Sequence, residues 1–248
     1  MAVFLTMLAV GMVLGFVGAG GSGFIIAILT VVFGFPIQTA FGTSLAAMVF
    51  TTLSGTYSHY REGNIAVKTG VFTGLLGAVG AFAGTRLAEL FPRHDLTWFT
   101  AGMLFLSALL LWLRIFLMAR LRQKPPRVHS GVRFWLSAAI IGLVTGTLSG
   151  TFGIGSTPFI QIGLLTFLGL TIRQSAGTTM LVILPIALAG GLGYYSLGHL
   201  DLKLLVEVVA GTMLGSYVGA KFTARVPQPV LKTAMVAVPI LGGLVMLL

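Results

Sequence analysis

The strongest constraint on this chain comes from its apolar stretches, which are long, continuous and almost free of charge. A membrane-spanning helix needs about 20 apolar residues. Only 8% of the residues are charged, against about 25% in soluble domains, so lipid and neighbouring helices must cover most of the surface. Continuous runs of this kind disfavour a barrel, whose strands are about 10 residues of alternating polarity. We therefore predict an all-α polytopic integral membrane protein, with apolar stretches at 2–34, 39–58, 67–88, 96–118, 133–168, 174–197, 202–222 and 229–248.

The second half of the chain repeats the first. A shift of 135 positions aligns the halves without a gap, and glycines fall on glycines. The match predicts two homologous transmembrane repeats, residues 1–113 and 134–248. Between them, residues 114–133 hold six basic residues, no acidic one and a proline pair, which is typical of a cytoplasmic linker. Small residues four apart, such as Gly80 with Gly84 and Gly215 with Gly219, should pack helices closely.

The basic residues also bear on the orientation of the halves. Four crossings in each half would make the halves parallel, with nine basic residues on the linker side and six opposite. If the long first segment of each half folds back, either as a re-entrant hairpin or as two full crossings, the halves are inverted. Twelve basic residues then share the linker side, and three lie opposite. The positive-inside rule favours these inverted repeats, with both termini outside. Inverted repeats with broken helices are typical of secondary transporters.

Each long first segment contains a cluster of glycine and hydroxyl residues that should interrupt the helix. Free backbone groups are tolerated at membrane depth only inside protein or beside a water-filled cavity. The helix that follows each break would point its N-terminus, with its free amides and positive dipole end, at the break. Pro158 suits the first turn of such a helix. We therefore predict an anion site between the two breaks, although tight packing alone would also explain the glycines. The candidate residues are Gly18, Gly20, Gly21 and Ser22 in the first half, and Gly153, Gly155, Ser156 and Thr157 in the second.

Hydroxyl side chains also open the next span of each half. Gly42-Thr43-Ser44 aligns with Gly177-Thr178-Thr179. These hydroxyls could cap the helix or donate to an anion, whereas serine and threonine in membrane helices often bond their own backbone. We add Thr43, Ser44, Thr178 and Thr179 to the candidate substrate-binding residues.

Ionisable residues inside the spans are rare. Glu207 lies about one turn into the stretch 202–222 and is the candidate for proton coupling, with an interfacial role as the alternative. His59 and His199 have no neighbouring ligand at metal-binding spacing, so we expect no metal and no cofactor. No nucleophile constellation and no phosphate loop ending in Gly-Lys-Ser/Thr is present. We therefore expect no enzymatic activity.

The motif set resembles the TauE/SafE family of sulfite and organosulfonate exporters. The resemblance rests on Gly-Ala-Gly-Gly-Ser-Gly-Phe-Ile at 18–25, the Gly-Thr-Ser at 42–44, the duplicated half and the basic linker. It implies export of small sulfur-containing or other organic anions across the plasma membrane. The expected partners are thus a small anionic substrate and the lipid bilayer, without nucleic acid, and a homo-oligomer stays open. A passive anion channel is the alternative. A membrane-embedded enzyme or assembly subunit is a third hypothesis, but the clustered histidine and acidic residues that would favour it are missing from the sequence.

Overall fold

The computed structural model describes residues 1–17, 22–120, 131–223 and 228–248. Within these residues all regular secondary structure is helical, and five helices are long and apolar enough to cross a membrane. This confirms the predicted all-α polytopic class. Gly18, Gly20 and Gly21, together with linker residues 121–130, lie outside the described residues.

The helices of the two halves correspond one to one. The first half contains α1 (Ala2–Val17), α2 (Ser22–Ala27) continued by the π-helical segment η1 (Ile28–Val32), α3 (Ile37–Arg61), α4 (Val67–Ala88) and α5 (Arg93–Arg120). The second half contains α6 (Val132–Phe152), α7 (Thr157–Thr166), α8 (Ile172–Ser196), α9 (Leu202–Thr223) and α10 (Gln228–Leu247). Helix α5 runs on to Arg120 and so enters the segment that the sequence assigned to the linker.

Both long first segments are split into two helices. In the second half, α6 ends at Phe152 and α7 begins at Thr157, which confirms the predicted break. Helix α7 has 10 residues, or about 15 Å at 1.5 Å per residue, half of a hydrocarbon core of about 30 Å. The segment formed by α2 and η1 is about as short. Each segment is therefore too short to cross a bilayer as a single helix.

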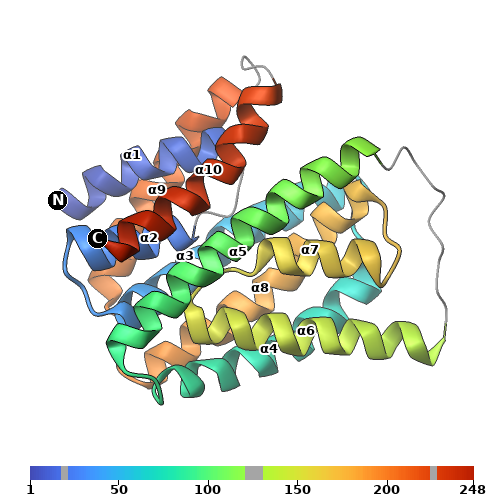
Figure 1. Ribbon diagram of the computed structural model, residues 1–248, viewed down its shortest axis with the longest axis horizontal. Coiled ribbons are helices and arrows are strands. Elements are labelled where there is room, and N and C mark those ends of the chain that lie inside the picture. The colour runs from blue at the N-terminus through green and yellow to red at the C-terminus, as the bar shows by residue number, and fades with distance from the viewer. Residues whose placement is uncertain (18–21, 121–130, 224–227) are drawn as a thin grey trace.

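The two halves exchange their first helices. Helix α1 packs along α9 of the other half, and α6 packs along α4 of the other half. Helix α3 also packs on α8, and α5 on α10. Figure 1 shows α1, α9 and α10 grouped together, with α4, α6 and α8 forming a second group. Each half therefore completes its packing only with helices of the other.

Glycines let these exchanged helices touch backbone to backbone. A Cβ atom added to Gly146 of α6 would overlap the carbonyl oxygen of Gly77 in α4, and one on Gly150 would overlap that of Ala81. In the α1–α9 pair, a Cβ on Gly11 would lie 2.6 Å from the carbonyl oxygen of Thr212. The predicted close packing through Gly80 and Gly215 is confirmed, because a Cβ on either would also meet the backbone of the facing helix.

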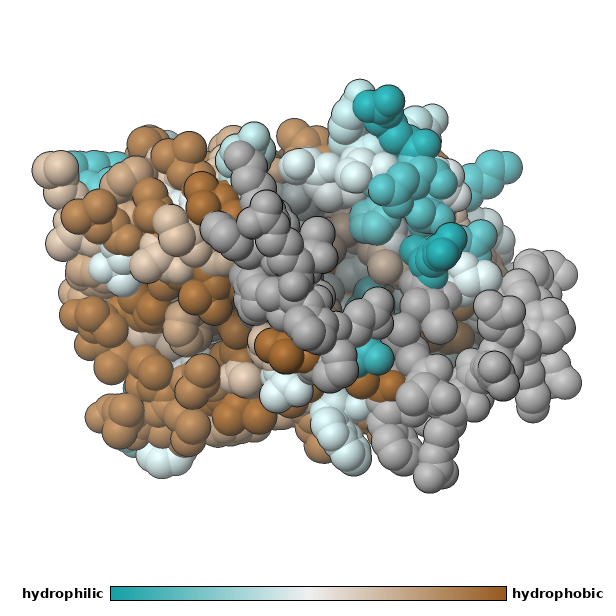
Figure 2. Space-filling view, turned by 90° about the horizontal axis from the view of Figure 1, so that it is seen from above, coloured by the Kyte–Doolittle hydropathy of each residue, from teal (hydrophilic) through white to brown (hydrophobic). Residues whose placement is uncertain are grey.

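The ends of the chain and the ends of the linker lie at opposite ends of the molecule. Both termini are at the left of Figure 1, whereas α5 ends and α6 begins at the right. Figure 2 shows an extensive apolar surface, with most of the polar residues in that view gathered toward the end where α5 finishes. Large apolar side chains such as Val79 of α4 and Leu136 of α6 are exposed on the outside of the protein, as lipid contact requires.

The glycine contacts predict a sharp difference between two substitutions. Gly146→Leu should strongly reduce the yield of folded protein, because its side chain would collide with the backbone of α4, which cannot yield as a side chain does. Gly102→Leu on α5 is the matched control, since a Cβ there meets no atom within 4 Å. Size-exclusion chromatography of detergent-solubilised protein measures both. Equal profiles for the two variants would contradict the role given to the close packing.

Candidate functional site

The break between α6 and α7 is a strained, buried turn. Gly153 ends α6 in the left-handed region with φ 65°, and Ser156 precedes α7 with φ 44°. Ser156 is the only non-glycine residue with positive φ among the described residues. Pro158 lies in the first turn of α7, as predicted. The backbone thus bends sharply inside the protein, and the first amides of α7 have no acceptor within their own helix.

The break between α6 and α7 contacts the start of α2. The amide of Gly155 donates a hydrogen bond to Oγ of Ser22, the first residue of α2, over 3.0 Å. The hydroxyl of Ser44 in α3 donates to the carbonyl oxygen of Ser22 over 3.4 Å. Because a hydroxyl carries one proton and two lone pairs, Ser22 can accept from Gly155 and still donate to a ligand. The sequence-predicted residues Ser22, Ser44 and Gly155 therefore belong to one local network.

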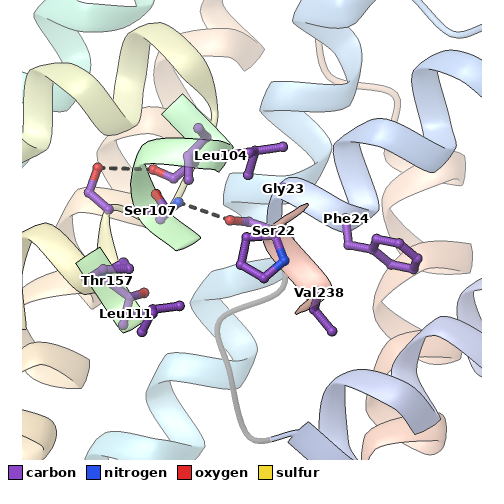
Figure 3. A pocket seen from close by; sticks show the side chains of 13 residues that line it. Ser22, Gly23, Phe24, Leu104, Ser107, Leu111, Thr157 and Val238 are labelled. Carbon is purple, nitrogen blue, oxygen red and sulfur yellow. Dashed lines mark hydrogen bonds between the residues drawn. The ribbon is translucent and has the colours of Figure 1, made fainter. Parts of the chain in front are cut away.

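A small cavity lies at this meeting point. It offers about 30 Å³, which is room for roughly two water molecules. Residues from α2, α5, α7, α10 and the turn before α7 line it (Figure 3). Its hydroxyl side chains are Ser22, Ser107, Ser156 and Thr157, and none of its described lining residues is charged. The cavity can therefore hold a ligand only through neutral hydrogen-bonding groups and apolar contact.

Flexible apolar side chains enclose the breaks. The thioether end of Met48 lies where a Cβ of Gly155 would be, and Leu104 contacts Gly23 in the same way. The ring of Phe41 packs against Gly153. Gly153 consequently supports the turn without lining the cavity.

Four predicted hydroxyl residues do not line the cavity: Thr43, Ser44, Thr178 and Thr179. Oγ1 of Thr178 accepts a hydrogen bond from the amide of Ala66, and the hydroxyl of Thr179 donates to the carbonyl of Ser175 in its own helix over 2.7 Å. Thr43 is fully buried outside the cavity lining. These hydrogen bonds of Thr178 and Thr179 fit the alternative interpretation of their hydroxyls, in which they serve packing and the helix.

The glycines of the same two motifs have a packing role that sequence reasoning missed. A Cβ on Gly42 would lie 2.9 Å from the carbonyl oxygen of His199, in the loop between α8 and α9. A Cβ on Gly177 would overlap the carbonyl oxygen of Asn64, in the loop between α3 and α4. Because these two glycines have no side chain, a loop of the opposite half can pack directly against the helix at each of them.

The ionisable groups lie away from the cavity. The carboxylate of Glu207 is 3.3 Å from the amino group of Met1, and Nε2 of His199 is 3.0 Å from Oε1 of Glu89. None of these groups lines the cavity. Among the described residues, no three histidine or acidic side chains gather as metal ligands would.

Ser107 is a cavity residue that sequence reasoning missed. It lies in the middle of α5, within the apolar stretch 96–118, and only 3% of it is exposed. The signal in the sequence was a lone hydroxyl in an otherwise apolar run, Leu-Ser-Ala-Leu-Leu-Leu.

Comparison with known proteins gives one consistent result. The family model described as "Sulfite exporter TauE/SafE" matches residues 3–246. The chain is 53% identical over 247 residues to "Probable membrane transporter protein YdhB" of Bacillus subtilis, covering the whole of both chains. It is 25% identical to "Probable membrane transporter protein YjnA" of Bacillus subtilis, over 96% of this chain and 95% of the relative. A "Probable membrane transporter protein" of Xylella fastidiosa is 27% identical, over 87% of this chain and 82% of the relative. No solved structure matches the chain.

The positive φ of Ser156 allows the backbone strain in the turn before α7 to be tested by substitution. Ser156→Gly should be more stable than Ser156→Ala by about 1 kcal/mol, because glycine adopts the left-handed region without a Cβ clash. Both variants lose the hydrogen bond from the Ser156 hydroxyl to Ile154, so their difference isolates the backbone. Thermal unfolding in detergent measures it. An alanine variant as stable as the glycine variant would show that the turn is not strained.

Proposed function

The chain belongs to the sulfite exporter TauE/SafE family of membrane transporters, and from this we propose that it is a secondary transporter of small anions. The proposed substrates are sulfite, sulfonates or related sulfur-containing or organic anions. The proposed direction is export across the plasma membrane, by alternating access between the two sides.

The observation that carries this proposal is the contact between Gly155 and Ser22 at the edge of the cavity. It joins the start of α7 to the start of α2, each at the beginning of a segment too short to cross a bilayer. The positive dipole end of α7 and its free amides favour negative charge. Hydrogen bonds to an ionised acceptor are roughly twice as strong as neutral ones. An anion is therefore the ligand that best fits a cavity lined by hydroxyls and a helix N-terminus.

The arrangement of the helices supports inverted halves. Both termini lie at one end of the molecule, whereas α5 ends and α6 begins at the other end (Figure 1). Because α2 and α7 are too short to cross, each would fold back with the helix before it as a re-entrant hairpin. Each half would then cross three times, which is an odd number. The inverted arrangement also places twelve of the 15 basic residues on the linker side, in line with the positive-inside rule.

The small size of the cavity supports a cycle with an occluded state. The cavity holds roughly two water molecules, so a polyatomic anion needs its walls to move apart. Pro239 of α10 lines the cavity and lies inside its helix, where proline removes a backbone hydrogen bond and permits bending. We place the movement at α10 and its partner α5. Glu207 keeps its proposed role in proton coupling, which would act where α1 meets α9 and away from the cavity.

Filling the break should stop transport. In Gly155→Leu, the new side chain would displace the flexible end of Met48 and crowd the hydroxyl of Ser22 at the edge of the cavity. Because the end of a side chain can yield, the protein should still fold and reach the membrane. We expect sulfite flux in proteoliposomes to fall to the level of empty liposomes. Gly102→Leu is the control and should transport normally.

Wild-type flux through Gly155→Leu would show that the substrate passes elsewhere. The same assay separates the alternative function, a passive anion channel. Wild-type flux that rises in proportion to concentration without saturating would favour the channel over the transporter.

The inverted arrangement can be tested independently of transport. A topology reporter fused after Leu248 should report an external location, and one inserted after Arg120 should report the cytoplasm. Alkaline phosphatase and a fluorescent protein, active on opposite sides of the membrane, measure this. A cytoplasmic C-terminus together with a cytoplasmic Arg120 would favour parallel halves.

A further inference from the structure

We propose that the hydroxyl of Ser107 on α5 binds the transported anion directly and favours oxyanions over halides. This inference rests on the proposed function and adds a residue that the duplicated motifs do not contain. Figure 3 shows Ser107 at the cavity, together with Ser22 of α2 and Thr157 of α7.

The first argument is burial without a partner. Ser107 is 97% buried, and its Oγ has no hydrogen-bond partner among the described residues. A buried hydroxyl without a partner costs free energy, and such groups are rare in native structures. Within the described part of the chain, Ser107 is the one such group that also lines the cavity. A ligand oxygen in the cavity would supply the missing acceptor.

The second argument is that Ser107 does not bond its own helix. Buried hydroxyls in membrane helices usually donate to the carbonyl four residues earlier. Thr52, Thr145 and Thr179 all do so, over 2.6 to 2.7 Å. The hydroxyl of Ser107 makes no such bond, so it does not serve to stabilise α5.

The third argument comes from the repeat. The position that matches Ser107 in the second half is Gly242, which lies against the backbone of Phe24 in α2 and does not line the cavity. A hydroxyl needed by the shared scaffold would be expected in both halves. Because the first half alone has this hydroxyl, we assign it a role in binding the ligand.

The chemistry of the cavity then indicates the class of ligand. Donors reach it from separate elements: Ser22 from α2, Ser107 from α5 and the N-terminus of α7. None of the described lining residues is charged, so recognition depends on how many acceptor atoms meet these donors. An anion with several oxygens can accept from separate directions at once. A halide also accepts several hydrogen bonds, but all of them at one centre, so it meets donors on separate elements less well than a polyatomic oxyanion and gains less from Ser107.

The kinetic test compares Ser107→Ala with Ser149→Ala. Ser149 is a fully buried serine of α6, also without a partner, but it does not line the cavity. In proteoliposomes, Ser107→Ala should raise the KM about tenfold for the oxyanion that the wild type carries best among sulfite, methanesulfonate and nitrate. The maximal rate and the KM for chloride should change less than about threefold. Ser149→Ala should leave every value near wild type.

A second pair of variants tests binding of the anion without a measurement of transport. The chain contains no cysteine, so Ser107→Cys and Ser149→Cys each place a single thiol in an otherwise natural protein. A saturating oxyanion should slow labelling of the thiol at 107 by a methanethiosulfonate reagent at least about threefold. Labelling at 149 should not respond.

The results distinguish a failure of the proposed function from a failure of the role proposed for Ser107. If wild-type protein carries none of the three oxyanions saturably, the proposed function fails and the inference falls with it. If wild-type flux is saturable but Ser107→Ala matches Ser149→Ala in KM, the inference alone is overturned. Equal protection of the two thiols would overturn it as well.

Discussion

The high free-energy cost of an unpaired peptide group in lipid constrains the whole structure. Residues 153–156 leave the helical path in the buried interior of the protein, and each unpaired amide or carbonyl there would cost several kcal/mol. The break can exist only because protein surrounds it on every side. Phe41, Met48 and Leu104 provide part of that cover. The amide of Gly155 finds a partner in Ser22 of the other half. The site and its enclosure are therefore two aspects of the same physical requirement.

The enclosure depends in turn on how closely the helices approach. Lipid gives no hydrophobic force to drive membrane helices together, so close packing through small residues does more of that work. Gly142, Gly146 and Gly150 line one face of α6, and each brings the backbone of α4 into contact. Gly11 and Gly15 do the same for α1 against α9. These two contacts hold the outer helices in place, and the broken segments with their cavity lie between them.

Local features of the sequence were the ones that could be predicted. Glycine and proline act on their own backbone, so the break at Gly153 and the restart of the helix near Pro158 followed from the sequence, as did the helical class and the close contact at Gly80. Contacts between distant helices could not be predicted, because hydropathy does not say which helices are neighbours. Thr178 lies against the loop at Ala66, and Gly42 lies against the loop at His199. Ser107 reaches the cavity because α5 packs beside α7 and α10, a lateral arrangement that no local pattern encodes.

The exchange of first helices has a consequence for how the protein is made. During synthesis, α1 enters the membrane long before its packing partner α9 has been made. The glycine-lined face of α4 likewise has no packing partner until α6 has been made. During that interval these narrow, glycine-lined faces meet lipid or the insertion machinery in place of their final partners. The first half therefore cannot reach its final packing before α6 and α9 have been made. Assembly becomes a late event, completed only when the last third of the chain has entered the bilayer.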